Sequence, residues 1–244
     1  MHPHRFRFFV SAADSASVSI EDSEHLHLAK VLRLPVGTEV EVFDGTGWVA
    51  WGCIQDISSR SARVRIDGVL PAREKKPSSI VCLGALKPNS CDDLFPPLVE
   101  LGVDVFHLFL SEGNARHRGS DSAQARWHRI LLTAVKQCKR ATIPTIFVWP
   151  SCEALLQGAA FPADAQRWLL DPESAVSLGE GVRAQAPSVL AIGSEKGLSS
   201  VESTLFREAG FVPVSMGDSI LRATTAAIAA VAVVSSFSFR HHEL

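Results

Sequence analysis

Two short motifs near the C-terminus carry residues whose types and spacing suit the binding of a small ligand. In the first, Gly193 and Gly197 bracket Glu195, directly after an apolar run at residues 188–192. Glycines at a strand-to-helix turn let a ligand approach the backbone closely, because no Cβ atom stands in the way. The end of a buried strand is also where α/β sheets usually bind ligands. Plain turn glycines explain the pattern about equally well, so both interpretations stay open.

The two polar residues after these glycines have a structural interpretation. Ser199 is followed three residues later by Glu202, the spacing of a capping box that begins a helix. We therefore expect these side chains to start a helix rather than to take part in catalysis.

The second motif, at residues 216–226, places an arginine near the start of another helix. Asp218 or Ser219 is the expected N-cap, which puts Arg222 in the first turn of a helix that runs to about residue 235. A cation there opposes the helix macrodipole by about 0.3 kcal/mol or more. Such an arginine usually holds an anion, which here is a carboxylate of the fold, a ligand carboxylate or an RNA phosphate.

The elements that position these motifs follow an alternating pattern from residue 78 onward. Helices are expected at residues 92–101 and 120–139. Apolar, strand-like runs occur at residues 80–86, 103–110, 145–149, 167–170, 188–192 and 211–215. Strands alternating with helices predict an α/β domain with a mostly parallel sheet.

The first seventy residues have a different, β-rich pattern. A helix is expected at residues 23–32, and strands at residues 39–43, 49–54 and 62–69. The charged, proline-bounded stretch at residues 71–77 is the best linker candidate. We therefore expect one domain over residues 1–72 and a second over residues 73–244.

Composition excludes several protein classes. The 244 residues include five scattered cysteines with no C-x-x-C pair, which favours the reducing cytoplasm over a disulfide-stabilised or zinc-binding protein. His25 and His27 are two residues apart and have no matching partner pair, so we expect no metal site. The N-terminus lacks an apolar signal segment, and no apolar stretch approaches the roughly 18 residues of a membrane span.

Basic residues are unevenly distributed although the formal net charge is only −2. Residues 115–140 contain seven basic residues and a single acidic one, which favours a polyanionic partner. Further basic residues lie among phenylalanines in the first domain, a combination that suits RNA phosphates and bases, although the phenylalanines equally well fill a small core. The candidate RNA-binding residues are Arg5, Arg7, Lys30, Arg33, Arg116, Arg118 and Arg140.

The two C-terminal motifs, in this order and about twenty residues apart, resemble the paired signatures of the RsmE-type RNA methyltransferases of the SPOUT superfamily. The resemblance covers nearly the whole chain. It includes the segments at residues 7–10, 27–28, 31–37, 42–45, 87, 100–104, 137–140 and 144. It implies a C-terminal SPOUT-type domain with a trefoil knot and a mostly parallel sheet, preceded by a small PUA-like β-barrel that binds RNA.

The resemblance also implies an activity: methylation of uridine N3 in 16S ribosomal RNA of the small ribosomal subunit, by a homodimer that uses S-adenosylmethionine. Arg222 would stabilise the uridine anion. By position, the cofactor would be held by Leu170, Gly193, Glu195, Gly197, Met216, Gly217, Ile220, Leu221 and Ala223.

Four motif residues depart from the family pattern. Ser194 and Lys196 stand where the family has proline and glycine, and Ser219 and Thr224 replace an arginine and a glutamate. Two alternatives therefore stay open beside the methyltransferase. One is a catalytically inactive SPOUT-like dimer that binds RNA, and the other is a methyltransferase that acts on a different RNA base.

Overall fold

The computed structural model divides the chain into two compact units. It describes residues 5–14, 16–71, 78–85, 88–110, 121–184 and 186–238. The first unit comprises Met1–Glu74 together with Val135–Ile143, and the second comprises Lys75–Ala134 and Pro144–Leu244. The expected linker lies almost entirely outside the described residues.

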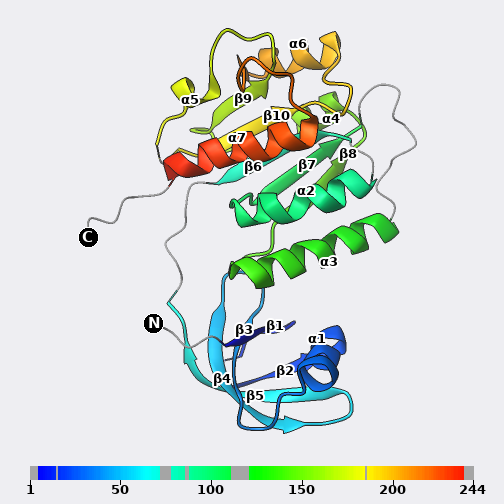
Figure 1. Cartoon of the computed structure of the whole chain (residues 1–244), viewed down its shortest axis with the longest axis vertical. Helices are drawn as coiled ribbons and strands as arrows, with labels where there is room; N and C mark the ends of the chain where they lie inside the picture. Colours follow the sequence, from blue (N-terminus) through cyan, green and yellow to red (C-terminus); the bar gives the residue numbers. More distant parts are fainter. Residues whose placement is uncertain are drawn as a thin grey trace. The chain divides into compact units, whose positions relative to one another are not determined.

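The first unit is built on a five-stranded sheet (Figure 1). Its strands are β1 (Phe6–Phe9), β2 (Ser17–Glu21), β3 (Glu39–Phe43), β4 (Val49–Ile57) and β5 (Ser61–Val69), in the order β1-β3-β4-β5-β2. β1 runs parallel to β3, and the other pairs are antiparallel. The predicted β-rich module is thus confirmed, with β1 and β2 as additional strands. The expected helix is α1 (Asp22–Leu26) followed by a π-helix, η1 (His27–Leu32).

Alternation along the strands decides which face of this sheet forms the core. In β3, Val40 and Val42 are fully buried, and they pack with Phe8, Ala50 and Ile54 in one apolar cluster. Intervening residues point to the other face, as the period-two pattern of a strand requires.

Residues 135–143 complete the first unit from a distant part of the sequence. The Ile143 amide donates to the Gly45 carbonyl at 2.9 Å, and the Lys136 ammonium pairs with the Glu24 carboxylate at 2.7 Å. Gly45 has a φ of +78°, and a Cβ atom there would lie 2.6 Å from the Ile143 side chain. This glycine therefore permits both the turn and the close approach of the returning chain.

The second unit contains the predicted parallel sheet. Its strands are β6 (Ser79–Gly84), β7 (Val105–Phe109), β8 (Thr145–Trp149), β9 (Gln166–Leu170), β10 (Ser188–Ile192) and β11 (Val212–Val214), in the order β11-β9-β10-β6-β7-β8. Every pair is parallel. All residues of β6 and β10 are buried, as expected for central strands covered on both faces. The predicted α/β class is confirmed.

The remaining helices are α2 (Pro88–Glu100), α3 (Asp121–Cys138), α4 (Cys152–Gly158), α5 (Leu178–Gly181), α6 (Ser200–Glu208) and α7 (Ala223–Ser238). α4 and α6 contact strands β7, β8 and β9, and α7 contacts β10, whereas Trp127 of α3 packs on Phe95 of α2. α2 and α7 pack against each other, as do α4 and α6 (Figure 1). Leu155 of α4 and Phe206 of α6 join Leu169, Val189 and Ala191 of the sheet in one core cluster.

The predicted capping box is present at the start of α6. The Ser199 hydroxyl accepts from the Glu202 amide at 3.1 Å, and the Glu202 carboxylate accepts from the Ser199 amide at 2.7 Å.

We expect Ser199→Ala to lower the free energy of unfolding by about 0.5–2 kcal/mol, because the Glu202 amide at the helix start loses its hydrogen-bond acceptor. Urea unfolding measures this loss. Ser200→Ala, at the exposed next position, is the control, and an equal loss in both variants would contradict the assignment.

His107 in β7 makes the stability of the second unit depend on pH. Its ring is buried, and Nδ1 accepts a hydrogen bond from the Trp149 indole N–H at 3.0 Å. Burial lowers the pKa of His107 to about 4. Since an unfolded histidine titrates near pH 6.5, the unfolded state binds more protons between about pH 6.5 and 4. Stability should therefore fall as the pH decreases through this range, by up to about 1.4 kcal/mol per pH unit.

The histidine contribution is isolated by the His107→Asn variant. The asparagine oxygen keeps an acceptor for the indole but does not titrate, so the variant should show a shallower pH dependence between pH 6.5 and 4. Urea unfolding at several pH values gives both slopes. Identical slopes would exclude His107 as the source.

Candidate functional site

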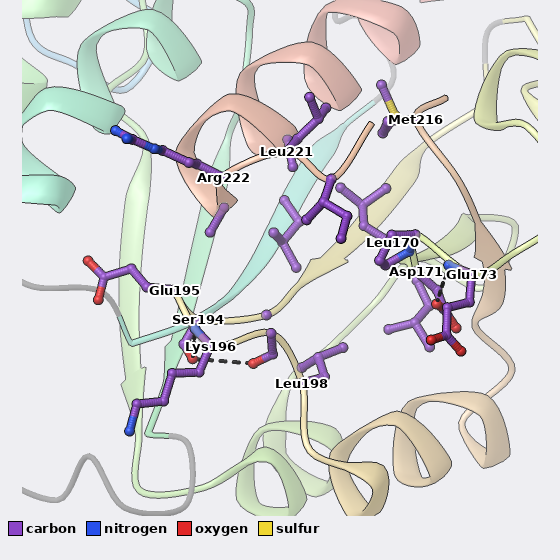
Figure 2. Close-up of a pocket in the computed structure, with 18 of the residues that line it drawn as sticks. Leu170, Asp171, Glu173, Ser194, Glu195, Lys196, Leu198, Met216, Leu221 and Arg222 are labelled. Carbon is purple, nitrogen blue, oxygen red and sulfur yellow. Dashed lines mark hydrogen bonds between the residues drawn. The ribbon is translucent and has the colours of Figure 1, made fainter. Parts of the chain in front are cut away.

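A cavity of about 520 Å³ opens at the carboxyl ends of β9, β10 and β11 in the second unit (Figure 2). Its volume lies in the range of small-molecule sites. Residues 169–173 after β9, residues 192–198 after β10 and residues 214–223 around the end of β11 supply nearly all of its lining. Three neighbouring parallel strands thus deliver their loops to one place, as the position of ligand sites in α/β sheets predicts.

The glycine loop after β10 is tightly closed. A Cβ atom on Gly193 would lie 2.6 Å from the Leu198 nitrogen and closer still to the carbonyl carbon of Gly197, so only glycine fits at residue 193. Gly197 has a φ of +83°, which disfavours other residues. The first of the two interpretations of these glycines gains support, because both residues line the cavity.

The hydrogen bonds of Ser194 explain how a serine can replace the family's proline at this position. Its hydroxyl donates to the Gly197 carbonyl at 3.2 Å and accepts from the Lys196 amide at 3.3 Å (Figure 2). The Gly197 amide in turn donates to the Ser194 carbonyl at 2.9 Å. The buried serine therefore stabilises the turn by side-chain hydrogen bonds, whereas a proline at this position would restrict the backbone φ angle through its ring.

The second motif lines the same cavity as the glycine loop. Gly217 has a φ of +115°, and the Ile220 side chain is 86% exposed at the rim. The expected start of the following helix at Asp218 or Ser219 is wrong. α7 begins at Ala223, and the Arg222 carbonyl accepts its first hydrogen bond, from Ala226.

All residues that the sequence assigned to cofactor and catalysis line this one cavity. They are Leu170, Gly193, Glu195, Gly197, Met216, Gly217, Ile220, Leu221, Arg222 and Ala223. Sequence reasoning did not select several further lining residues, including Asp171, Glu173 and Ser203. Asp171 and Glu173 directly follow a predicted strand, which is the signal that could have found them.

Charged groups differ between the two sides of the cavity. Asp171 is paired with Arg207 of α6 at 2.8 Å. On the other side, Glu195 accepts a hydrogen bond from the Ser90 hydroxyl at 3.2 Å. Arg222 is exposed, and within the part of the chain that the structure describes its guanidinium has no hydrogen-bond or ion-pair partner. This cation is therefore available to an anion from outside the fold.

The lining suits a ligand with both apolar and polar parts. Leucine, isoleucine and methionine side chains contribute to the walls, and the lining also includes charged side chains and three glycines. Apolar walls with a few fixed polar groups bind and orient a small organic molecule. No group of three or more metal-ligating side chains occurs among the described residues.

Two of the candidate RNA-binding arginines are engaged within the first unit. Arg7 is only 8% exposed, pairs with Glu41 at 3.0 Å and lies 4.2 Å from the centre of the Phe43 ring. Arg5 pairs with Glu39 at 2.9 Å. The structure thus places Arg7 inside the unit rather than on its surface, because its charge and stem stabilise the packing there.

The other candidates divide between exposed and undescribed positions. Lys30 and Arg33 are exposed on and just after η1, and Arg33 adopts a left-handed backbone with a φ of +51°. Arg140 is half-buried and lies two residues after the end of α3. Arg116 and Arg118 lie outside the described residues. No helix in the described ranges is long and apolar enough to span a membrane.

Relatives of known name resemble the chain over most of its length. A Synechocystis protein named ribosomal RNA small subunit methyltransferase E is 27% identical over 224 residues, which cover 91% of this chain and 73% of the relative. A Mycobacterium bovis protein of the same name is 26% identical over 234 residues, covering 93% of this chain and 89% of the relative.

A solved structure shares the fold. The crystal structure of a ribosomal RNA small subunit methyltransferase E from Neisseria gonorrhoeae, bound to S-adenosyl methionine, matches with a TM-score of 0.85 and 25% identity, covering 96% of this chain and 98% of that one. The SPOUT-type fold expected from the sequence is therefore confirmed. Residues 20–67 match a family model described as the RNA methyltransferase PUA domain, and residues 73–235 match one described as the RNA methyltransferase domain. Because the second match spans more than half of the chain, this protein belongs to the RNA methyltransferase family, as the RsmE-type resemblance of its motifs predicted.

Proposed function

We propose that this protein transfers a methyl group from S-adenosylmethionine to N3 of a uridine in 16S ribosomal RNA of the small ribosomal subunit. One observation carries the proposal: ten residues from three loops, selected from the sequence for this chemistry, line a single cavity of about 520 Å³. The names of the relatives, and the S-adenosyl methionine bound by the Neisseria structure, support the same cofactor and substrate class.

The residues of the cavity fit this cofactor. Leu170, Met216, Leu221 and Ile220 offer apolar surface, and Gly193 and Gly217 have no Cβ atom that would keep a ligand away from the backbone. When bound, S-adenosylmethionine supplies an electrophilic methyl group on a sulfonium. The protein contributes by orientation, because holding a methyl donor in line with its acceptor supplies much of the rate of such a transfer.

Arg222 is the proposed catalytic cation. Uracil N3–H is weakly acidic, and loss of its proton places negative charge on the neighbouring carbonyl oxygens. An exposed guanidinium at the cavity rim, with no partner among the described residues, can stabilise this developing charge.

The first unit is the proposed site of RNA binding. Lys30 and Arg33 are exposed on one short segment of this unit. Basic side chains of this kind hold RNA mainly through its phosphates, so the affinity should fall as the salt concentration rises.

We also propose that the chain acts as a homodimer in the cytoplasm, where ribosomal subunits are found. The sixteen residues of α7 contain no charged side chain, and Phe237 near its end is 38% exposed. A second copy of the chain could bury such an apolar surface in a dimer interface. Light scattering after size exclusion measures the mass, and a monomer at micromolar concentration would contradict this part of the proposal.

Two measurements test the activity. Calorimetric titration with S-adenosylmethionine should give a Kd in the micromolar range, about −8 kcal/mol. Incubation with small ribosomal subunits that lack the modification should then produce a methylated uridine. Because an N3 methyl group blocks the Watson–Crick edge, reverse transcriptase should stop at that nucleotide. Cofactor binding without any such stop would point to another base, and no cofactor binding with or without RNA would favour a non-catalytic RNA-binding protein.

A further inference from the structure

The side chain of Glu195 is placed differently from the other residues of the cavity. It is exposed at the rim, and its Oε1 accepts a hydrogen bond from the Ser90 hydroxyl at 3.2 Å. Figure 2 shows Glu195 and Arg222 extending to the same side of the cavity, while Asp171 and Glu173 lie at the opposite side. One rim therefore combines a carboxylate and a guanidinium that come from different loops.

The acidic residues on the two sides of the cavity differ in their hydrogen-bond and ion-pair partners. The Asp171 carboxylate is held by Arg207 at 2.8 Å, so its charge is already compensated within the fold. Among the described residues, Glu195 has only the neutral Ser90 hydroxyl as a hydrogen-bond partner, and it forms no ion pair there. A neutral donor orients a carboxylate and leaves it able to accept a proton. The same side of the cavity therefore carries both a hydrogen-bond acceptor and a cation.

This pair of charges is complementary to one particular face of uracil. The N3–H donor of uracil is flanked by two carbonyl oxygens, O2 and O4, which take up the charge when the proton leaves. A carboxylate facing N3–H and a guanidinium facing one of the oxygens match this order of groups. Carboxylates are established general bases in enzymes, and removing one that acts on the reacting proton costs about 10²- to 10⁴-fold in rate.

We infer that Glu195 is the general base that accepts the N3 proton of the target uracil. The inference rests on the proposed function and adds a catalytic residue to it. In the step, the bond between the methyl carbon and sulfur breaks and its electron pair stays on sulfur, which becomes a neutral thioether. The methyl carbon bonds to N3, and the N3 proton passes to the Glu195 carboxylate and from there to water.

Glu195→Gln tests this assignment, because the amide keeps the size and the Ser90 contact but is not a base. The single-turnover rate of methylation of small ribosomal subunits at neutral pH should fall by about 10²- to 10⁴-fold. The Kd for S-adenosylmethionine, measured by calorimetry, should change less than about threefold, within the range of a neutral contact. Glu208→Gln, an exposed position on α6 away from the cavity, is the matched control and should keep the normal rate.

A substrate with a more acidic N3–H shows whether Glu195 acts as a base or only supports the structure. Small subunits assembled with 5-fluorouracil in their RNA carry an N3–H that ionises more readily, so they need the base less. The rate ratio between the native protein and Glu195→Gln should shrink on this substrate, and it should also shrink at alkaline pH, where uracil loses its proton unaided. A ratio unchanged by either, or a Kd for the cofactor raised tenfold or more, would assign Glu195 to structure or to cofactor binding and overturn the inference.

The activity of the native protein shows whether a negative result refutes only the role of Glu195 or the proposed function as a whole. If it methylates uridine N3 while Glu195→Gln is as fast, only the role of Glu195 is refuted. If the native protein methylates neither normal nor 5-fluorouracil-containing subunits, the proposed function fails and takes this inference with it.

Discussion

Replacing Gly193 by alanine is expected to weaken the binding of S-adenosylmethionine by about 10- to 100-fold. The new Cβ atom would lie 2.6 Å from the Leu198 nitrogen, and its neighbours are backbone atoms that cannot rotate away. Overpacking of this kind costs about 1–3 kcal/mol, and 1.4 kcal/mol corresponds to a tenfold change in affinity. The loop must open to relieve the contact, which displaces the wall formed by residues 193–198. Calorimetric titration measures the affinity.

A second glycine provides the control for this experiment. Gly179 in α5 has an ordinary backbone conformation, and the nearest atom to a Cβ there is the Ser177 hydroxyl oxygen at 3.9 Å. Gly179→Ala should therefore bind the cofactor as the native protein does. Native affinity in Gly193→Ala would show that the loop tolerates the extra atom, and the argument from close approach would be wrong.

Arg222→Ala is expected to lower the rate of methylation by about 10²- to 10³-fold while leaving the cofactor affinity nearly unchanged. Removing one group that stabilises an anionic transition state costs about 2.7–4 kcal/mol. The guanidinium has no partner among the described residues, so its removal should leave the thermal unfolding midpoint almost unaltered. Single-turnover methylation of small ribosomal subunits gives the rate, and calorimetry gives the affinity.

Two further variants define the role of this arginine. Arg183→Ala removes an exposed arginine outside the cavity and should keep the native rate. Arg222→Lys retains the charge but loses the planar fork, so its rate should lie between those of the native protein and Arg222→Ala. Unchanged turnover in Arg222→Ala would remove this residue from the mechanism.

Local sequence patterns predicted the elements whose formation depends on neighbouring residues. The alternation at residues 39–43 predicted a half-buried strand because one face of β3 packs on the core. The spacing of Ser199 and Glu202 predicted the start of α6 because both hydrogen bonds are local. The cavity loops were predicted for a related reason, since ligand sites of parallel sheets follow the strand ends and glycines mark the turns.

Features set by contacts between distant residues were not predicted. The short strands β1 and β2 lie at the two edges of the first sheet and carry no long alternation of their own. Asp218 and Ser219 are good N-cap residues, yet α7 begins only at Ala223, after a loop most of whose residues line the cavity. Likewise, nothing near Arg7 in the sequence indicates its burial, which depends on Glu41 and on the chain at Val135.

The return of residues 135–143 to the first unit has a consequence for the order in which the protein is made. The unit begins at the N-terminus, but Lys136 and Ile143, which contact Glu24 and Gly45, are synthesised about half a chain later. While the ribosome is still adding α2 and β7, the Glu24 carboxylate and the Gly45 carbonyl lack these partners. The N-terminal module therefore cannot reach its final form as an independent early folding event. Its completion must wait for the nascent chain to extend past Ile143, when much of the second sheet is not yet synthesised.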